Sequence, residues 1–116
     1  MDKSTQIKEM KKEHLAFEVF KIVSETTKVH PKEFLLFSRD RTIQKARHLA
    51  FYLTRDMLKG ITNTDFSILV DRNPTSITSS RQAAEVLFKK DKEFQGWTKE
   101  CLEKIKALKL NDVKWT

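Results

Sequence analysis

The sequence predicts an all-α domain in which several helices pack around one core. Glycine and proline each occur only twice among the 116 residues, whereas β-sandwiches and barrels need frequent turn residues. Apolar residues recur at spacings of three and four along several segments, which is the period of an amphipathic helix. Hydrophobic residues make up 39% of the chain and include eight Phe and two Trp. These large side chains suffice for the core of one compact multi-helix domain.

The first half of the chain is expected to hold three helices. The first covers residues 3–27, and Pro31 opens a short second helix over residues 31–36, because proline suits the first helical position. The third and most regular helix covers residues 42–59, with Gly60 as its C-cap. Its apolar stripe comprises Ile43, Ala46, Ala50, Leu53 and Met57.

Two helices joined by a short turn are expected next, which is the layout of a helix-turn-helix. Thr62 is a capping residue for a helix over residues 63–70, and Asn73 followed by Pro74 favours a new helix over residues 74–90. In this motif the second helix enters the major groove of DNA and its first residues contact base edges. The same small polar residues would also suit an ordinary surface helix.

The rest of the chain completes the expected domain organisation. Residues 1–26 are expected to be an N-terminal helix or extension, and residues 27–110 the helix-turn-helix domain. Residues 111–116 are expected to be a loose tail with Trp115 as its only anchor. The apolar positions that trace the last helix are Phe94, Cys101, Ile105 and Leu108.

The net charge of +7 is concentrated in residues 28–60. Eight basic and three acidic side chains lie in this third of the chain, so +5 of the total falls there. Such an excess is the footprint expected for a polyanion partner, although charge alone would equally fit a solvated helix face. The basic residues are Lys28, Lys32, Arg39, Arg41, Lys45, Arg47, Arg55 and Lys59.

Residues 39–56 resemble the signature helix of the C-terminal DNA-binding domain (domain IV) of the bacterial replication initiator DnaA. That family has a basic R-x-R loop followed by an A-R-x-x-A-x-Y-L-x-R-E helix, which matches Arg39 to Asp56. The family segment G-G-R-D-H-T-T-V falls without a gap on residues 70–77, and the similarity covers roughly residues 27–108. The resemblance implies a Trp-repressor-like fold with a helix-turn-helix, in a standalone protein without the ATPase domain.

The resemblance implies three groups of DNA contacts. The residues that would enter the minor groove from the basic loop are Arg39 and Arg41. The phosphate contacts would come from Lys45, Arg47, Arg55, Thr62 and Asn63, the last two through backbone N–H groups. The residues that would face base edges are Arg72, Asn73, Pro74, Thr75, Ser76 and Ser79.

The sequence departs from the family at the turn and at two base-reading positions. Val70 and Asp71 replace the family's glycine pair, so a differently shaped turn is expected. Asn73 and Pro74 replace an acidic reader and a histidine, which leaves an amide and an apolar ring to contact bases. We therefore expect DNA binding with a sequence preference that differs from the DnaA box.

The sequence gives no support for an enzyme or a metal protein. His14, His30 and His48 lie on separate elements without metal-ligand spacing. Cys101 has no partner for an internal disulfide, and no apolar run approaches the length of a membrane span. We expect a cytoplasmic, nucleoid-associated protein without a cofactor.

The predicted function is sequence-specific binding of double-stranded DNA in the regulation of replication or transcription. The alternative is a protein-interaction module that retains the DnaA-like scaffold without specific DNA readout. Its surface would be the N-terminal helix with Phe17 and Phe20, together with Trp97 or Trp115, although core packing is the more common role of such residues.

Overall fold

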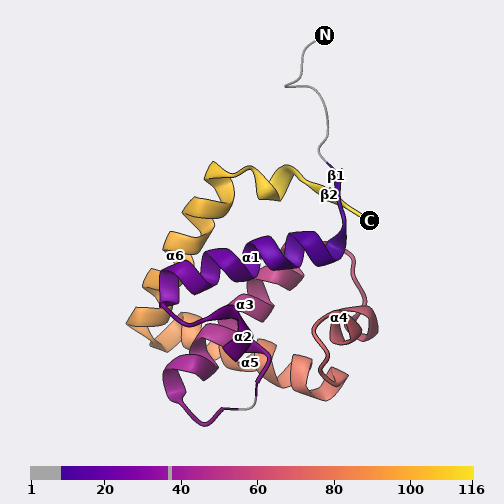
Figure 1. The fold of residues 1–116 in the computed structure, drawn as a ribbon. Helices are drawn as coiled ribbons and strands as arrows, with labels where there is room; N and C mark the ends of the chain where they lie inside the picture. The colour runs from indigo at the N-terminus through magenta and orange to yellow at the C-terminus, as the bar shows by residue number, and fades with distance from the viewer. Residues whose placement is uncertain (1–8, 37) are drawn as a thin grey trace.

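Six α-helices form most of the computed structural model, which describes residues 9–36 and 38–116 (Figure 1). A 3₁₀ turn and two strands of two residues each complete the described elements. The all-α class predicted from the sequence is confirmed. The helices are α1 (Lys12–Thr27), α2 (Pro31–Phe34), α3 (Arg41–Met57), α4 (Asn63–Leu69), α5 (Pro74–Lys90) and α6 (Lys92–Ala107). The strands are β1 (Glu9–Met10) and β2 (Lys114–Trp115).

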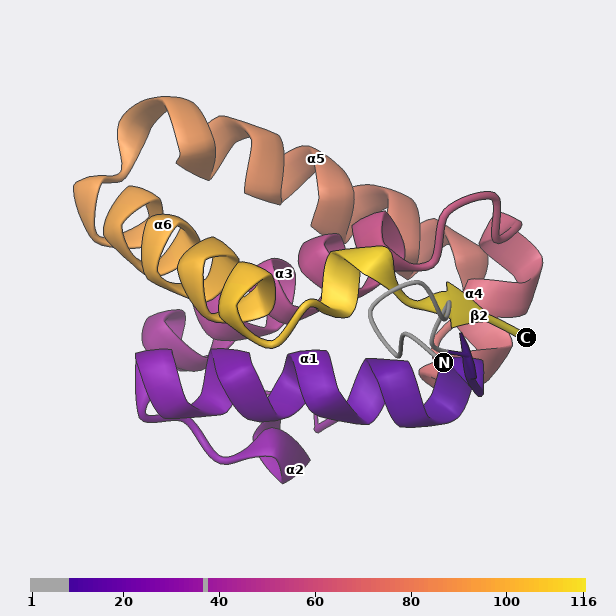
Figure 2. The ribbon, with the colours of Figure 1, turned by 90° about the horizontal axis from the view of Figure 1, so that it is seen from above.

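Helix α3 is the centre of the fold. It packs against α1, α2, α5 and α6, and Figure 2 shows α1 and α5 on opposite sides of it. Three phenylalanines on different elements, Phe34, Phe66 and Phe94, are completely buried. Burying one such side chain contributes roughly 1.5–3 kcal/mol, so these rings fix the short helices α2 and α4 to the core.

Helix α1 belongs to the same core and is not a separate extension over its described length. Leu15, Val19 and Val23 on this helix are completely buried. The helix begins at Lys12, whereas the sequence predicted a start at residue 3. Residues 3–8 of the predicted helix lie outside the described part of the chain. Glu9 and Met10 are extended because their backbone pairs with another strand.

The expected loose tail is wrong, because the C-terminal residues are fastened to the domain. Strand β2 pairs in parallel with β1, with Met10 opposite Trp115. The Trp115 indole N–H donates to the Lys59 carbonyl at 3.1 Å. Just before the tail, Leu110 is buried at 4% exposure. Backbone pairing between the two ends of the chain leaves no periodic signal in a two-residue strand, and the sequence therefore did not reveal it.

The helix starts agree with the capping residues. Asp40 accepts the Ile43 N–H at the start of α3, and Asn73 accepts the Ser76 N–H at 2.8 Å at the start of α5. Two ends differ from the prediction by two residues. Helix α2 stops at Phe34, and α3 ends before a cap residue at Leu58, so Gly60 is not the C-cap but lies in the turn beyond it, at φ +85°.

Residues 70–73 connect α4 to α5. Asp71 has a φ of +55°, a conformation in which Asp is more often found than most residues other than glycine. The following N–H of Arg72 donates back to the Ser67 carbonyl at 2.9 Å. An aspartate therefore takes a left-handed position within the segment where the DnaA family has its glycine pair.

Candidate nucleic-acid interface

An open groove lies between α3 and the first two turns of α5. Its volume is about 500 Å³, and none of the described residues that line it carries a carboxylate. It gathers five of the six residues that were expected to face base edges; only Pro74 is missing from its lining. The lining residues are Arg47, His48, Phe51, Arg72, Asn73, Thr75, Ser76, Ser79, Ser80 and Ala83.

Two arginines give this groove a positive charge that the described residues do not neutralise. Arg47 comes from α3 and Arg72 from the turn before α5, and neither forms an ion pair within residues 9–36 and 38–116. Burial and then the charge of Arg72 lower the pKa of the Arg47 guanidinium. One Arg72 nitrogen, Nη2, is shielded from solvent and has no hydrogen-bond partner among the described residues. An anion between the two guanidinium groups would compensate their charge and accept a hydrogen bond from Arg72 Nη2. The site is therefore suited to a phosphate.

The first turns of α5 present small polar side chains beside these arginines. Thr75, Ser76 and Ser79 are exposed. The Asn73 side-chain oxygen accepts the Ser76 N–H as the helix cap, so the side-chain NH₂ is the group left to donate to a ligand. Hydroxyl and amide groups of this size can reach base edges in a major groove.

A chain of hydrogen bonds connects α3 through α4 to the start of α5. The Arg55 guanidinium donates to the Asn63 side-chain oxygen, and the Asn63 amide donates to the Pro74 carbonyl at 3.3 Å. Thr62 uses its hydroxyl to cap α4. Arg55 and Asn63, both predicted to contact phosphate, therefore have side chains that hold α5 in position.

The structure contradicts one of the predicted phosphate contacts, that of Lys45. Its ammonium lies 2.8 Å from both Asp91 and Glu93, and 5.3 Å from the centre of the Trp97 ring. The side chain is only 11% exposed. Burial alone would lower the pKa of Lys45, but the hydrogen bonds to the two carboxylates outweigh it and raise the pKa. Lys45 thus joins α3 to the start of α6 and is not available to DNA.

The ion pair of Lys45 makes a prediction about acid stability. Its hydrogen bond to Asp91 is the main cause that lowers the Asp91 pKa below the ordinary value of 3.8. A depressed carboxyl pKa stabilises the fold above the unfolded-state pKa, and this stabilisation is lost as the pH falls through the folded-state pKa. Lys45→Gln should therefore flatten the decline in unfolding free energy below about pH 4, as measured by urea denaturation at several pH values. An unchanged acid profile would contradict this role.

The basic residues at the start of α3 are exposed, with Arg39 just before the helix and Arg41 as its first residue. Arg39 and Arg41 are solvent-accessible, and neither forms an ion pair within the described ranges. Asp40 between them is held as the cap of α3. Arg41 also contributes to the lowered pKa of Asp91, which places its charge near the start of α6. Their entry into a minor groove stays a prediction.

The sequence did not predict the contact between His48 and Ser80, which both line the groove. His48 Nδ1 lies 2.7 Å from the Ser80 hydroxyl, which joins α3 to α5. Burial, followed by the charge of Arg47, lowers the His48 pKa to about 4, so the ring is neutral at physiological pH. Ser80 lies between Ile77 and Ala84 on the buried side of α5. A polar residue on an apolar stripe is the signal that could have indicated this contact, since buried polar groups need partners.

The comparisons with known proteins leave the family open. No model of a known protein family matches this chain, and no curated protein matches it. The resemblance to the DnaA domain is therefore a prediction from the motifs alone. None of the helices within the described ranges is long and apolar enough to cross a membrane.

Proposed function

We propose that this chain binds double-stranded DNA in a sequence-specific manner and regulates replication or transcription. The observation that carries the proposal is the groove between α3 and α5. Two arginines without carboxylate partners lie there beside exposed hydroxyl groups of the first turns of α5. This combination supplies charge for phosphates and small donors and acceptors for base edges.

In this proposal α4 and α5 act as a helix-turn-helix and α5 is the recognition helix. Arg47 and Arg72 hold the backbone at the groove, while Thr75, Ser76 and Ser79 contact bases. The exposed side chains of Arg39, just before α3, and Arg41, its first residue, reach the adjacent minor groove, where an inserted guanidinium favours narrow A·T-rich sequences. The proposed activity is binding without a catalytic step or cofactor.

The protein-interaction alternative has less support. Phe20 is 9% exposed and packs in the core, and Trp97 and Trp115 are partly buried with their own contacts. Of the aromatic residues considered for that surface, Phe17 is exposed, at 58%. A single exposed aromatic side chain is ordinary for a folded protein.

Salt dependence tests the proposed function directly. With about four neutralised phosphates, a plot of log affinity against log salt concentration should have a slope of about −4. The measurement is fluorescence anisotropy of a labelled duplex at several salt concentrations. Lys45→Gln is the matched control and should leave this slope nearly unchanged, because the Lys45 charge is already neutralised by Asp91 and Glu93. Absence of binding at low salt, or a flat slope, would refute DNA binding.

A further inference from the structure

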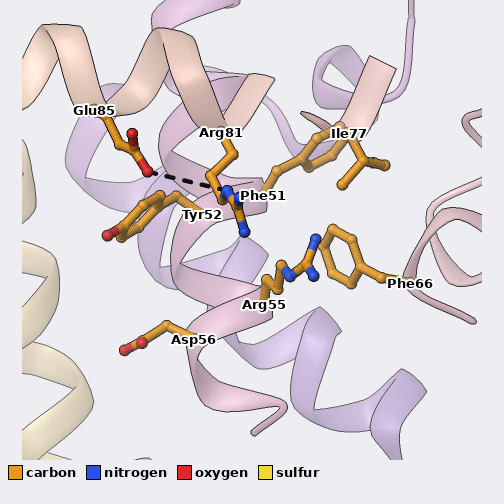
Figure 3. Close-up of a pocket in the computed structure, with 8 residues that line it drawn as sticks. All are labelled: Phe51, Tyr52, Arg55, Asp56, Phe66, Ile77, Arg81 and Glu85. Carbon is orange, nitrogen blue, oxygen red and sulfur yellow. Dashed lines mark ion pairs between the residues drawn. The ribbon is translucent and has the colours of Figure 1, made fainter. Parts of the chain in front are cut away.

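A second pocket lies on the other side of Phe51, again between α3 and α5. Figure 3 shows its eight lining residues, which come from α3, α4 and α5. Its volume of about 280 Å³ is near the lower end of the range for small-molecule sites. The lining residues are Phe51, Tyr52, Arg55, Asp56, Phe66, Ile77, Arg81 and Glu85.

The walls of this pocket are aromatic and apolar. Phe51, Phe66 and Ile77 are at most 5% exposed and are held in place by the core, with the Phe51 and Phe66 rings edge to face. Tyr52 adds a fourth apolar face and is itself fixed by an edge contact with Phe88. Preformed walls of this kind suit a flat apolar body, since little side-chain ordering is needed on binding.

Two guanidinium groups from different helices enter the same space. Figure 3 shows Arg55 of α3 and Arg81 of α5 directed toward it. Arg55 donates to the neutral amide oxygen of Asn63, so its charge is not compensated there. Arg81 is about half exposed, and its Nε lies 4.0 Å from the Glu85 carboxylate, which is a loose ion pair. Both groups thus retain donors for a carboxylate, the anion that arginine binds best in a planar geometry.

The acidic residues of the pocket distinguish it from the groove proposed for DNA. Asp56 and Glu85 line it together with the two arginines, so the four charged side chains sum to zero. A polyanionic strand would be repelled by these carboxylates, whereas one small carboxylate can lie at the arginine side. In the groove lined by Arg47 and Arg72, the part of the chain that the structure describes places no such carboxylates.

From these contacts we infer that the pocket binds a small carboxylate ligand with an aromatic body. The ring lies against Tyr52 and Phe51, which the buried Phe66 supports from the core, and the carboxylate accepts hydrogen bonds from Arg55 and Arg81. The site does not depend on the proposed DNA binding, because its walls and its charges are present in the free protein.

Three probes with one phenylpropyl body and different head groups test this site. They are 3-phenylpropionate, 3-phenylpropan-1-ol and 3-phenylpropylamine, each titrated into the full ¹⁵N-labelled chain and followed by amide chemical shifts. The carboxylate should shift the amides of Tyr52, Ile77 and Arg81. The alcohol and the amine should bind about tenfold more weakly, since each lacks the charge-assisted hydrogen bonds.

Arg81→Gln is the decisive variant because the side chain is exposed and its loss should not affect folding. It should weaken 3-phenylpropionate binding about tenfold and leave the alcohol unchanged. Lys89→Gln, which removes an exposed charge from the same helix outside the pocket, should change neither probe. The inference is overturned if no probe binds, if the three head groups bind equally, if Arg81→Gln binds like the parent, or if the shifts map elsewhere.

Discussion

Replacing Arg47 and Arg72 together with glutamine is expected to lower the affinity for duplex DNA at least about 100-fold on every sequence. Both guanidinium groups lie in the groove between α3 and α5, where no carboxylate among the described lining residues neutralises them. Each phosphate contact that is lost removes a charge-assisted hydrogen bond, worth roughly 1.5–3 kcal/mol. Because phosphate contacts position a protein without reading sequence, preferred and random duplexes should lose the same factor.

The unfolding free energy of the double variant shows whether a loss of affinity is due to lost contacts or to a destabilised fold. Burial, and after it the charge of Arg72, lowers the Arg47 pKa, as is expected where a partly desolvated cation lies near a second cation. The variant should therefore unfold no more easily than the parent in urea. A matched control removes two charges from the last turn of α5, Lys89→Gln with Lys90→Gln, and should reduce affinity less than about threefold. Equal losses for both double variants would show that net charge, not this groove, binds DNA.

The starts of α4 and α5 could be predicted from the sequence because their signals are local. Thr62 and Asn73 each accept the backbone N–H three residues later, as their residue types favour. The ends of the chain could not be predicted in this way. Pairing of Glu9 and Met10 with residues 114–115 depends on contacts across the whole sequence.

The charge excess of residues 28–60 predicted a basic region but not the face to which each charge belongs. Lys45 and Arg47 are two positions apart on α3, and such residues do not face each other on a helix. Lys45 consequently meets Asp91 and Glu93 at the start of α6, while Arg47 enters the groove beside α5. The carboxylates that neutralise Lys45 lie more than forty residues away, so counting local charge overestimated the surface available to DNA.

Only the wall of the groove that comes from one continuous segment could be predicted from the sequence. The wall formed by residues 72–79 could be predicted because these residues are adjacent in sequence and lie at the start of a helix. Their opposite wall, Arg47 with His48 and Phe51, depends on how α3 packs against α5. Arg55 is an example of a contact that depends on packing. Its place on α3 predicted a phosphate contact, and the structure adds a hydrogen bond from its guanidinium to Asn63.

Thr75→Ala is expected to reduce affinity for the preferred duplex by roughly 1–3 kcal/mol, and to leave affinity for random DNA nearly unchanged. Thr75 is exposed in the first turn of α5 and lines the groove, where its hydroxyl can contact a base edge. A contact with a base exists only on the matching sequence, and its loss therefore affects specific binding alone.

Thr78 supplies a matched control on the same helix. It is also an exposed threonine near the start of α5, but its hydroxyl donates to the Pro74 carbonyl at 3.2 Å, and it does not line the groove. Thr78→Ala removes the same atoms and should leave both affinities close to those of the parent. The preferred duplex is first selected from a random pool with the parent protein, and anisotropy titrations then compare the three proteins on it. If Thr75→Ala weakens random and preferred duplexes equally, or if Thr78→Ala has the same effect, α5 does not read bases in the proposed orientation.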